Sequence, residues 1–439
     1  DRLAPRAAPD GDELAAAPDS VPKGVRVVKD SLARTVLHLP AEADRPGIYI
    51  KCHKLRGWPH ASHATSGKRV TGRVVDPRER LKYATVANNA CMNCHKIHSA
   101  PHRERLLRFR RLEENCLNCH GGAVANFSIA GEIRKRSGHD SRFRFGRHDP
   151  TEKPFTMQRH VECVDCHNPH AAFHDPIGVV QGSFGQLVKG PNQNVSGVTL
   201  GGRDIDAARF LYEICFKCHG DGVLRPRNRI RRQVTQTNTR LEFQLGNPSY
   251  HPVAGPRRNP DVVSLTPPLR VGSVITCIDC HNSDNSRYAG GSGPNGPHGS
   301  IFTPLLIRNY TTADFTTESA ASYALCYGCH SRDSILNNES FPLHRFHVVD
   351  QRAPCSACHD AHGVFRGQGN RSNHGSLINF DRSIVTPADA PGGGRRIEYR
   401  DTGRFSGNCT LTCHGQAHVG FPYSRGGAPR SIVSRRSFP

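Results

Sequence analysis

The chain is poor in the residues from which a conventional hydrophobic core is built. Only 36% of its 439 residues are apolar and only 7% are aromatic, with a single tryptophan. Soluble domains usually contain a larger apolar share, so the side chains alone offer little material for a core of this size. No apolar run approaches the length of about 20 residues that a transmembrane helix needs. We therefore expect a chain that does not span a membrane.

Methionine and lysine are scarce as well, whereas histidine and cysteine are abundant. The chain has two methionines, Met92 and Met157, and 11 lysines beside 48 arginines. It has 26 histidines and 17 cysteines. Glycine, with 42 residues, and proline, with 31, interrupt the sequence throughout. Such frequent interruption predicts a chain dominated by loops.

Sixteen of the seventeen cysteines belong to eight copies of one motif, numbered here in chain order. Motifs 1–7 read Cys-x-x-Cys-His, and motif 8 reads Cys-x-x-x-Cys-His. Cys-x-x-Cys-His is the attachment signature of c-type haem: both thiols bind porphyrin vinyl groups and the histidine binds the iron. The sequence thus predicts eight covalently bound haems. Their predicted attachment cysteines and proximal histidines are Cys91, Cys94 and His95; Cys116, Cys119 and His120; Cys163, Cys166 and His167; Cys215, Cys218 and His219; Cys277, Cys280 and His281; Cys326, Cys329 and His330; Cys355, Cys358 and His359; and Cys409, Cys413 and His414.

Zinc and thiol redox sites also use paired cysteines, so a single motif would not discriminate. A structural zinc site takes two such pairs for each ion and needs no histidine after each pair. Eight copies, each followed at once by histidine, favour haem.

Haem also changes what the chain needs as a core. Eight haems leave about 55 residues for each one, and the porphyrins would supply the missing apolar surface. The expected fold class is a multihaem cytochrome c, mostly coil with short helices and few short strands, wrapped around a chain of stacked haems. The arginine-rich residues 102–111 predict a short helix that faces haem propionates. Alternation over 25–28 and 47–51 predicts two short strands.

The second axial ligand of each iron follows from a count. Methionine is the usual alternative to histidine, but Met92 lies inside motif 1 and only Met157 remains. Eighteen histidines lie outside the motif positions. We therefore expect two histidine ligands, and a low potential, at every haem.

Nine of these histidines are the predicted distal ligands. Three follow a motif as Cys-His-x-x-His, where a helical turn would place the second histidine on nearly the same face as the first. It then cannot reach the far side of its own haem, but it can reach a neighbouring iron. The others precede motif 3, lie between motifs 6 and 7, or stand in loops. The nine are His98, His170, His362, His160, His344, His347, His139, His251 and His298; the remaining histidines, including His63, His374 and His418, are not among the predicted ligands.

The motifs divide the chain into four segments. Residues 1–85 hold no complete motif and are expected to provide short strands and subunit contacts. Residues 86–250 carry motifs 1–4, residues 251–420 carry motifs 5–8, and residues 421–439 form a basic tail. We expect no independent domains, because the haem chain should run through the junction.

The seventeenth cysteine, Cys52, precedes His53, but Tyr49 stands where a first haem cysteine would be. A ninth haem with a single thioether is one interpretation. A free or intermolecularly bonded thiol is the other.

The formal charge of +21 does not predict a nucleic-acid partner. Eight haems would bring about sixteen propionates, which offset much of that charge. Cytochrome c maturation takes place outside the cytoplasmic membrane. We therefore expect a mature, exported chain at the cell surface or in the extracellular space.

The strings around several motifs resemble the extracellular multihaem c-type cytochromes of metal-reducing bacteria, some of which polymerise into cytochrome nanowires. The resemblance covers roughly residues 86–420. It implies bis-histidine ligation, parallel and T-shaped haem pairs, and a haem chain continuous through a filament, in which one distal histidine can come from the adjacent subunit. It is carried by the strings 163–170, 277–284, 326–330, 341–347, 355–362, 377–381 and 409–415, and by His298.

The leading functional hypothesis is extracellular electron transfer by hopping along stacked bis-histidine haems, as the subunit of a homopolymeric filament. Its redox partners would be other cytochromes, extracellular metal oxides or cells. The alternative is a non-polymeric periplasmic or outer-membrane-associated carrier. A multihaem reductase of nitrite, hydroxylamine or tetrathionate is the third hypothesis. It needs an open iron position, which the histidine surplus argues against.

Overall fold

The computed structural model describes residues 26–29, 35–38, 53–70, 81–96, 98–101, 105–139, 141, 160–174, 181–182, 185–221, 230–256 and 258–425. Loops connect short elements over most of this length, as the frequent glycines and prolines predict. Within the described residues, no helix is long and apolar enough to cross a membrane.

Helices are short, and many consist of one turn. The longest are α4 (Leu112–His120) and α6 (Leu211–His219), and each ends on the histidine of a motif. The other α-helices are α2 (Ser62–Thr65), α3 (Val86–Asn89), α5 (Ile129–Glu132), α7 (Thr239–Glu242), α8 (Cys277–Cys280), α9 (Ala324–Tyr327), α10 (Arg332–Leu336), α11 (Cys355–Cys358) and α12 (Arg371–His374). The 3₁₀ turns are η2 (Trp58–His60), η4 (Ala90–Asn93), η7 (Cys163–Asp165), η8 (Gly190–Asn192), η9 (Arg287–Ala289) and η11 (Gly375–Leu377), and η10 (Phe346–Asp350) is a π-helical turn.

Most strands form two-residue pairs, and the only larger sheet within the described residues lies near the C-terminal end. There β14 (Glu398–Gly403), β15 (Ser406–Cys413) and β16 (Gln416–Ser424) form an antiparallel meander, and β11 (Val385–Thr386) pairs with the end of β15 on the side away from β16. The remaining strands are β1 (Arg26–Lys29) with β2 (Thr35–His38), β3 (Ser137–Gly138) with β9 (Gly299–Ser300), β4 (Gln181–Gly182) with β5 (Gly185–Gln186), β6 (Gly197–Val198) with β7 (Asp204–Ile205), β8 (Ser249–Tyr250) with β10 (Gly363–Val364), and β12 (Ala388–Asp389) with β13 (Arg395–Arg396).

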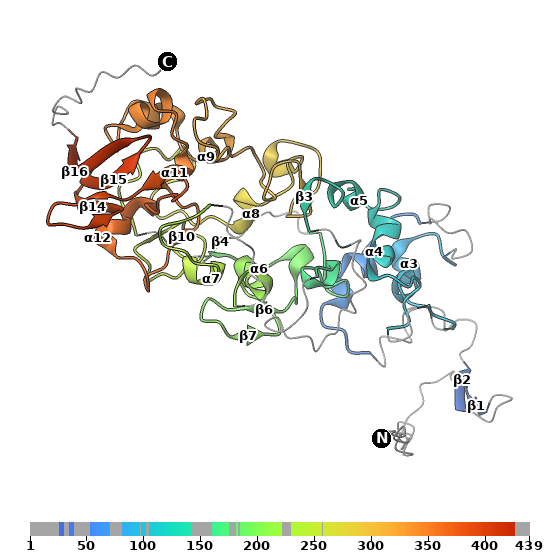
Figure 1. Ribbon diagram of the computed structural model, residues 1–439. Helices are drawn as coiled ribbons and strands as arrows, with labels where there is room; N and C mark the ends of the chain where they lie inside the picture. Colours follow the sequence, from blue (N-terminus) through green and yellow to red (C-terminus); the bar gives the residue numbers. More distant parts are fainter. Residues whose placement is uncertain are drawn as a thin grey trace, which may run out of the picture.

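The body is elongated, and the chain runs along its length (Figure 1). Helix α3, which precedes motif 1, and helix α4, which carries motif 2, lie near one end, and the sheet of β14, β15 and β16 lies at the other. Motif order along the sequence therefore follows position along the molecule.

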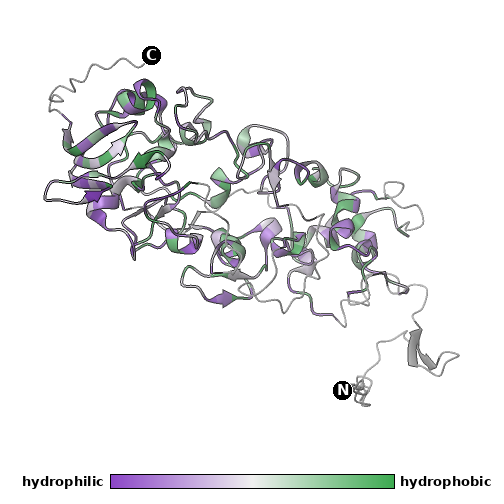
Figure 2. Ribbon diagram, viewed as in Figure 1, coloured by the Kyte–Doolittle hydropathy of each residue, from purple (hydrophilic) through white to green (hydrophobic). Residues whose placement is uncertain are grey.

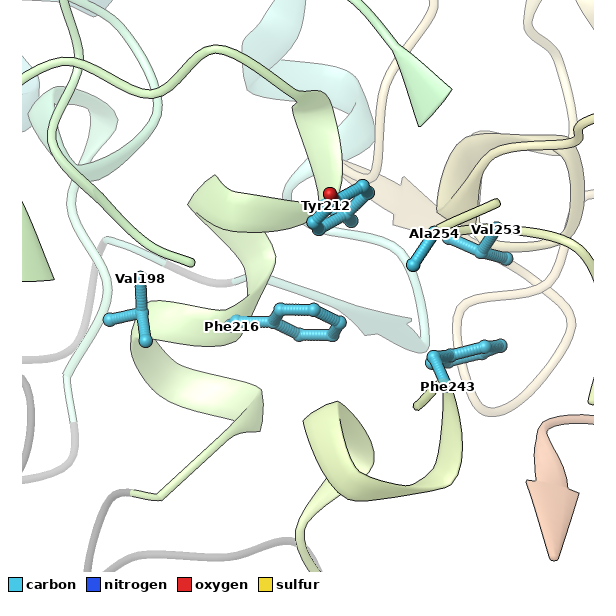
Figure 3. Packing of buried hydrophobic residues seen from close by; sticks show 6 residues of the cluster. All are labelled: Val198, Tyr212, Phe216, Phe243, Val253 and Ala254. Atoms are coloured by element: carbon cyan, nitrogen blue, oxygen red, sulfur yellow. The ribbon is translucent and has the colours of Figure 1, made fainter. Parts of the chain in front are cut away.

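Buried apolar side chains form several small clusters. One cluster joins α6 to the segments that follow it, with Tyr212 and Phe216 packed against Phe243 and Val253 (Figure 3). Apolar residues are scattered in short patches through the body (Figure 2). This is the pattern expected when the polypeptide alone does not supply a continuous core.

The segment between motifs 4 and 5 packs against motif 7. Strand β8 pairs with β10, so residues on either side of the expected 250/251 junction share one small sheet. The guanidinium of Arg232 donates to the carbonyls of Ser356, His359 and Asn379. These contacts tie the two halves of the haem region together.

The predicted helix over 102–111 is wrong for its described part. Residues 105–111 form turns and bends, and α4 begins at Leu112. Leu107 instead pairs with His95 in a β-bridge, and the side chain of Asn115 bonds to the backbone of Phe109 and Arg111. These tertiary bonds replace the helical ones.

Strand β1 covers most of the predicted strand 25–28, whereas 47–51 lies outside the described residues.

Candidate haem sites

Motifs 1, 3, 5, 6 and 7 share one backbone geometry. In each, the histidine N–H donates to the carbonyl of the first cysteine, at 2.8–3.0 Å. In motif 5, for example, the N–H of His281 donates to the carbonyl of Cys277 at 2.8 Å. One helical turn therefore places both cysteines and the histidine on one face. Motifs 2 and 4 reach the same arrangement at the ends of α4 and α6.

Motif 8 has a different backbone. Cys409 and Cys413 lie in strand β15, and His414 and Gly415 form the turn to β16. Both turn residues have positive φ, 49° and 74°, as a two-residue type I′ hairpin requires. Motif 8, which has one extra residue between its cysteines, therefore lies on a strand and a turn, whereas the other motifs lie on helical turns.

Histidine rings meet two at a time across the molecule, and eight such pairs are found among the described residues. Seven join a motif histidine to a histidine outside any motif. Their ring centroids are 6.1–6.5 Å apart. The seven are His95–His170, His120–His63, His167–His298, His219–His139, His281–His362, His330–His251 and His359–His344.

The eighth pair joins His347, in η10, to His418, in β16, with centroids 6.3 Å apart. Neither residue belongs to a Cys-x-x-Cys-His string. The histidine of motif 8, His414, instead places its Nε2 2.9 Å from the Asp314 carboxylate and stacks on Phe315 at 4.4 Å.

The spacing of these pairs fits an iron atom between the rings. An imidazole nitrogen binds a metal at about 2.0 Å and lies about 1.1 Å from its ring centroid, so two opposed ligands place their centroids about 6 Å apart. No group of three or more potential metal ligands is gathered elsewhere in the described part of the chain. The histidine pairs are thus suited to the two axial positions of haem iron.

Hydrogen bonds at the second ring nitrogen orient the rings. The Nδ1–H of His95 donates to the carbonyl of Arg105 at 2.8 Å, and that of His139 to Pro297 at 2.9 Å. A carbonyl can only accept, so Nδ1 carries the proton and Nε2 is left for the metal. The same arrangement holds for His63, His167, His251, His281, His347 and His359, whose Nδ1–H groups donate to the carbonyls of Pro169, Pro191, Ala361, Pro304, Leu343 and Ser376.

At four other rings, Nδ1 either meets a side chain or has no hydrogen-bond partner among the described residues. His330 Nδ1 lies 2.9 Å from the Ser264 hydroxyl, and the Nδ1–H of His362 donates to the Glu242 carboxylate at 2.9 Å. The Nδ1 atoms of His298 and His344 are buried and meet no hydrogen-bond partner among the described residues.

In four of the paired imidazoles, burial strongly favours the neutral state, which is the state that binds iron. It lowers the pKa of His120 and His281 to about 4, and that of His298 and His344 to about 3, with neighbouring histidines contributing in each case. The rings therefore hold no proton at Nε2 over the ordinary pH range.

Burial has the opposite effect on the thiols. It raises the pKa of Cys94, Cys166, Cys280 and Cys358 to about 12. Zinc ligands and redox-active cysteines act as thiolates, and this environment disfavours thiolates. It is compatible with sulfur atoms that become thioethers.

Cysteines of consecutive motifs lie side by side. Hydrogen bonding between the thiols links motif 2 to 3, 4 to 5 and 6 to 7, through Cys116/Cys163, Cys215/Cys277 and Cys326/Cys355. At the junctions of motifs 1 and 2, 3 and 4, 5 and 6, and 7 and 8, a cysteine of the second motif is near enough to help raise a thiol pKa in the first: Cys119 acts on Cys94, Cys215 on Cys166, Cys326 on Cys280 and Cys409 on Cys358. Each motif thus neighbours the next one in the sequence.

Two of the three Cys-His-x-x-His extensions contribute to pairs. His170, which follows motif 3, faces the histidine of motif 1, and His362, which follows motif 7, faces that of motif 5. His98, which follows motif 1, is exposed and faces no other described histidine. His95 itself forms a β-bridge with Leu107, and the N–H of Lys96 donates to the carbonyl of Leu106.

His160 lies close to the Glu162 carboxylate just before motif 3, and it stays a predicted ligand.

His63 and His418 are the paired histidines that sequence reasoning missed. His63 precedes motif 1 in α2, far from any motif in sequence, and carries no signal beyond being histidine. His418 follows motif 8 by four residues, which was the available signal. Cys52 lies outside the described residues, so the ninth haem stays a hypothesis.

Residues 84–125, which contain motifs 1 and 2, match the family model described as a doubled CXXCH motif. No curated protein and no solved structure matches the chain. The matched segment is short, but motifs 3–7 repeat its attachment pattern and motif 8 varies it by one residue. The doubled motif and its repetition along the chain indicate a multihaem c-type cytochrome, a class of proteins that transfer electrons.

Proposed function

We propose that the chain conducts electrons along a row of eight bis-histidine c-type haems, as the exported subunit of a polymeric filament outside the cell. The observation that carries the proposal is the order of the cysteine contacts. Among the described residues, the cysteines of each motif interact with cysteines of the motifs next to it in the sequence, in a line from motif 1 to motif 8. A single line suits a conductor, since every site has one neighbour on each side.

The contacts also alternate in kind along this line. The interaction between an even-numbered motif and the next motif joins the first cysteine of each. The interaction between an odd-numbered motif and the next motif starts from the second cysteine of the odd-numbered one. Two kinds of step support two alternating haem arrangements, such as the parallel and T-shaped pairs that the resemblance implies. The ends of the line lie at opposite ends of the elongated body (Figure 1), where subunits could join in series.

The protein side chains have a holding role. When bound, haem supplies the one-electron iron chemistry. The paired imidazoles hold the iron from both sides, and carbonyl acceptors such as that of Pro304 fix the ring orientation of His281. Rigid, closed coordination keeps the ligand set unchanged between oxidation states and leaves no position for a substrate.

Exposed apolar side chains support contact between copies at the motif 8 end. Phe315 and Val419 are 55% and 51% exposed beside the β15–β16 turn. Other cytochromes, metal oxides or cells would be the redox partners at the filament ends.

A non-polymeric electron carrier is the second candidate, and one observation favours it. All eight histidine pairs are formed within one chain. No ligand from an adjacent subunit is therefore needed. The same closed pairs disfavour a nitrite, hydroxylamine or tetrathionate reductase, which needs an open iron position.

Electron microscopy of the native, haem-loaded protein separates the two candidates. The filament proposal expects helical fibres with haems continuous across subunit boundaries. A monodisperse monomer, with solvent around its terminal haems, would reject the filament and leave the carrier. Substrate-dependent turnover by either form would revive the reductase.

A further inference from the structure

We infer that the haem attached at motif 8 has His418 and His347 as its axial ligands, and that His414, the histidine next to Cys413, is not a ligand but a structural residue of the hairpin turn. The inference rests on the haem attachment proposed above and not on the filament. It makes motif 8 a Cys-x-x-x-Cys-x-x-x-x-His site in function.

The strand register places His418 beside both cysteines. Side chains alternate along a strand, so Cys409, Leu411 and Cys413 share one face of β15. His418 is the cross-strand partner of Leu411, and directly opposed residues project from the same face. The imidazole of His418 therefore leaves the sheet between the two thiols, as the histidine of a helical motif does on its own face.

A second histidine is already opposite this ring. His347 lies 6.3 Å from His418 between centroids, within the range of the other seven pairs. Its Nδ1–H donates to the Leu343 carbonyl at 2.8 Å, which leaves Nε2 for a metal. The ring of Phe341 packs on both His347, at 5.5 Å, and Tyr423 of β16, at 4.7 Å. These contacts hold η10 against the hairpin.

His414 is engaged elsewhere. Its Nε2, the nitrogen that an iron would need, is bound to the Asp314 carboxylate, and its ring stacks on Phe315 at an interplanar angle of 19°. His414 is near enough to add to the effect of burial in lowering the pKa of His347. The ring facing His347 is nevertheless that of His418.

Attachment at motif 8 needs no redox partner. Each thiol adds across one vinyl group: a carbon–sulfur bond forms, the thiol hydrogen passes to the vinyl carbon, and the double bond becomes single. Cys409 and Cys413 act in the same way whichever histidine binds the iron. Ligand identity can therefore be tested separately from attachment.

The first test compares His418→Gly with His414→Gly in the haem-loaded, full-length protein. Intact mass gives the number of attached haems, and electron paramagnetic resonance gives the spin state of the ferric irons. We expect His418→Gly to keep its haems and to convert one haem to high spin, with added imidazole restoring low spin. His414→Gly should leave every attached haem low-spin.

The second test keeps a ligand side chain at each position, so that an empty position cannot prevent maturation. His418→Met should stay low-spin and gain the sulfur-to-iron charge-transfer band of a His/Met haem, whereas His414→Met should lack this band. The reverse result in either comparison overturns the inference. Loss of one attached haem in the Cys409→Ser/Cys413→Ser variant, read by mass, checks the underlying attachment independently.

Discussion

In each paired histidine, the hydrogen bond made by Nδ1 fixes the ring orientation and affects how basic Nε2 is as an iron ligand. In eight of the sixteen paired rings this nitrogen donates to a backbone carbonyl, which is neutral and fixed by the fold. His362 is different, since its Nδ1–H donates to the carboxylate of Glu242. Burial opposes protonation, but this carboxylate raises the overall pKa of His362. A charged acceptor makes the ligand more basic and stabilises the oxidised metal.

Replacing Glu242 with glutamine should therefore raise the potential of one haem, that of motif 5. The glutamine carbonyl can still accept the hydrogen bond, so the change removes charge and keeps the geometry. A difference of about 1.4 kcal/mol corresponds to about 59 mV for one electron, and we expect a rise on the order of 60 mV. Spectroelectrochemical titration measures it.

Ser264→Ala provides the matched control, because it removes a neutral acceptor from His330. It should move its haem less than Glu242→Gln does. Equal shifts in the two variants would show that the charge of Glu242 is not what sets the potential.

At the scale of elements, single helical turns and one hairpin position the ligands. The β15–β16 turn is the most demanding of these, because His414 and Gly415 both have positive φ. A β-branched residue in this conformation costs about 1–2 kcal/mol. The strain acts directly on the strand that carries His418.

Gly415→Val should therefore loosen the hairpin. In a fraction of the molecules, one haem should then convert from low to high spin, as read by electron paramagnetic resonance. Gly272→Val is the control: Gly272 also has positive φ, 93°, and a Cβ there would meet no atom within 4 Å, but it lies outside the sheet. An equal spin change in the control would mean that general destabilisation, and not the hairpin, is responsible.

Helix α10 is anchored by the Glu318 carboxylate, which accepts from the Arg332 guanidinium and from the Tyr327 hydroxyl. The hydrogen bond from Arg332 lowers the pKa of Glu318 below 4.5, and burial opposes this. A carboxyl group with a lowered folded-state pKa stabilises the fold above its unfolded pKa. That stability is lost as the pH falls through the folded value.

Glu318→Gln should accordingly lower the unfolding temperature near neutral pH, and the difference from the native protein should shrink as the pH falls below about 4.5. Thermal unfolding followed at several pH values measures this. Glu398→Gln alters a second carboxylate that is bound by arginines, Arg396 and Arg400, but the Glu398 side chain is 15% exposed, against 4% for Glu318, so its effect should be smaller. A difference that stays constant with pH would contradict the role of Glu318.

The whole molecule is organised as a line, so sites in the middle matter more than sites at the ends. Cys215→Ser with Cys218→Ser removes the attachment of the fourth haem, between motifs 3 and 5. We expect electron transfer from one end of the body to the other to fall by orders of magnitude, because electron hopping weakens steeply with distance.

The rate of electron transfer along the body is measured by time-resolved reduction of the purified protein, in which the spread of electrons among the haems is monitored. Removal of the first haem by Cys91→Ser with Cys94→Ser is the control, since it shortens the line without interrupting it. Similar rates in the two variants would mean that the haems do not act in series.

Much of the candidate site could be predicted from residues alone. The attachment cysteines and the motif histidines are read from local spacing, because one helical turn brings residues three and four apart together. The scarcity of methionine and surplus of histidine predict bis-histidine ligation without any geometry. Distal histidines close to a motif in sequence, such as His170 and His362, were also within reach of this reasoning.

Other assignments needed the fold. The same spacing from a motif predicts His170, His362 and His98 as ligands, but His98 is exposed and faces no other described histidine. His63 has no sequence signal and faces His120 from α2. No local pattern records which distant segments pack together.

Residue types at short spacing predict the chemistry of this protein, which is covalent haem and electron transfer, and they lead us to expect histidine ligands. The tertiary structure was needed to show which histidines face each other, the order of the motifs along the body, and the change from a helical turn to a strand at motif 8. The reason is physical. Attachment depends on neighbours in one turn of chain, whereas pairing depends on long-range packing that places rings such as those of His167 and His298 6.1 Å apart.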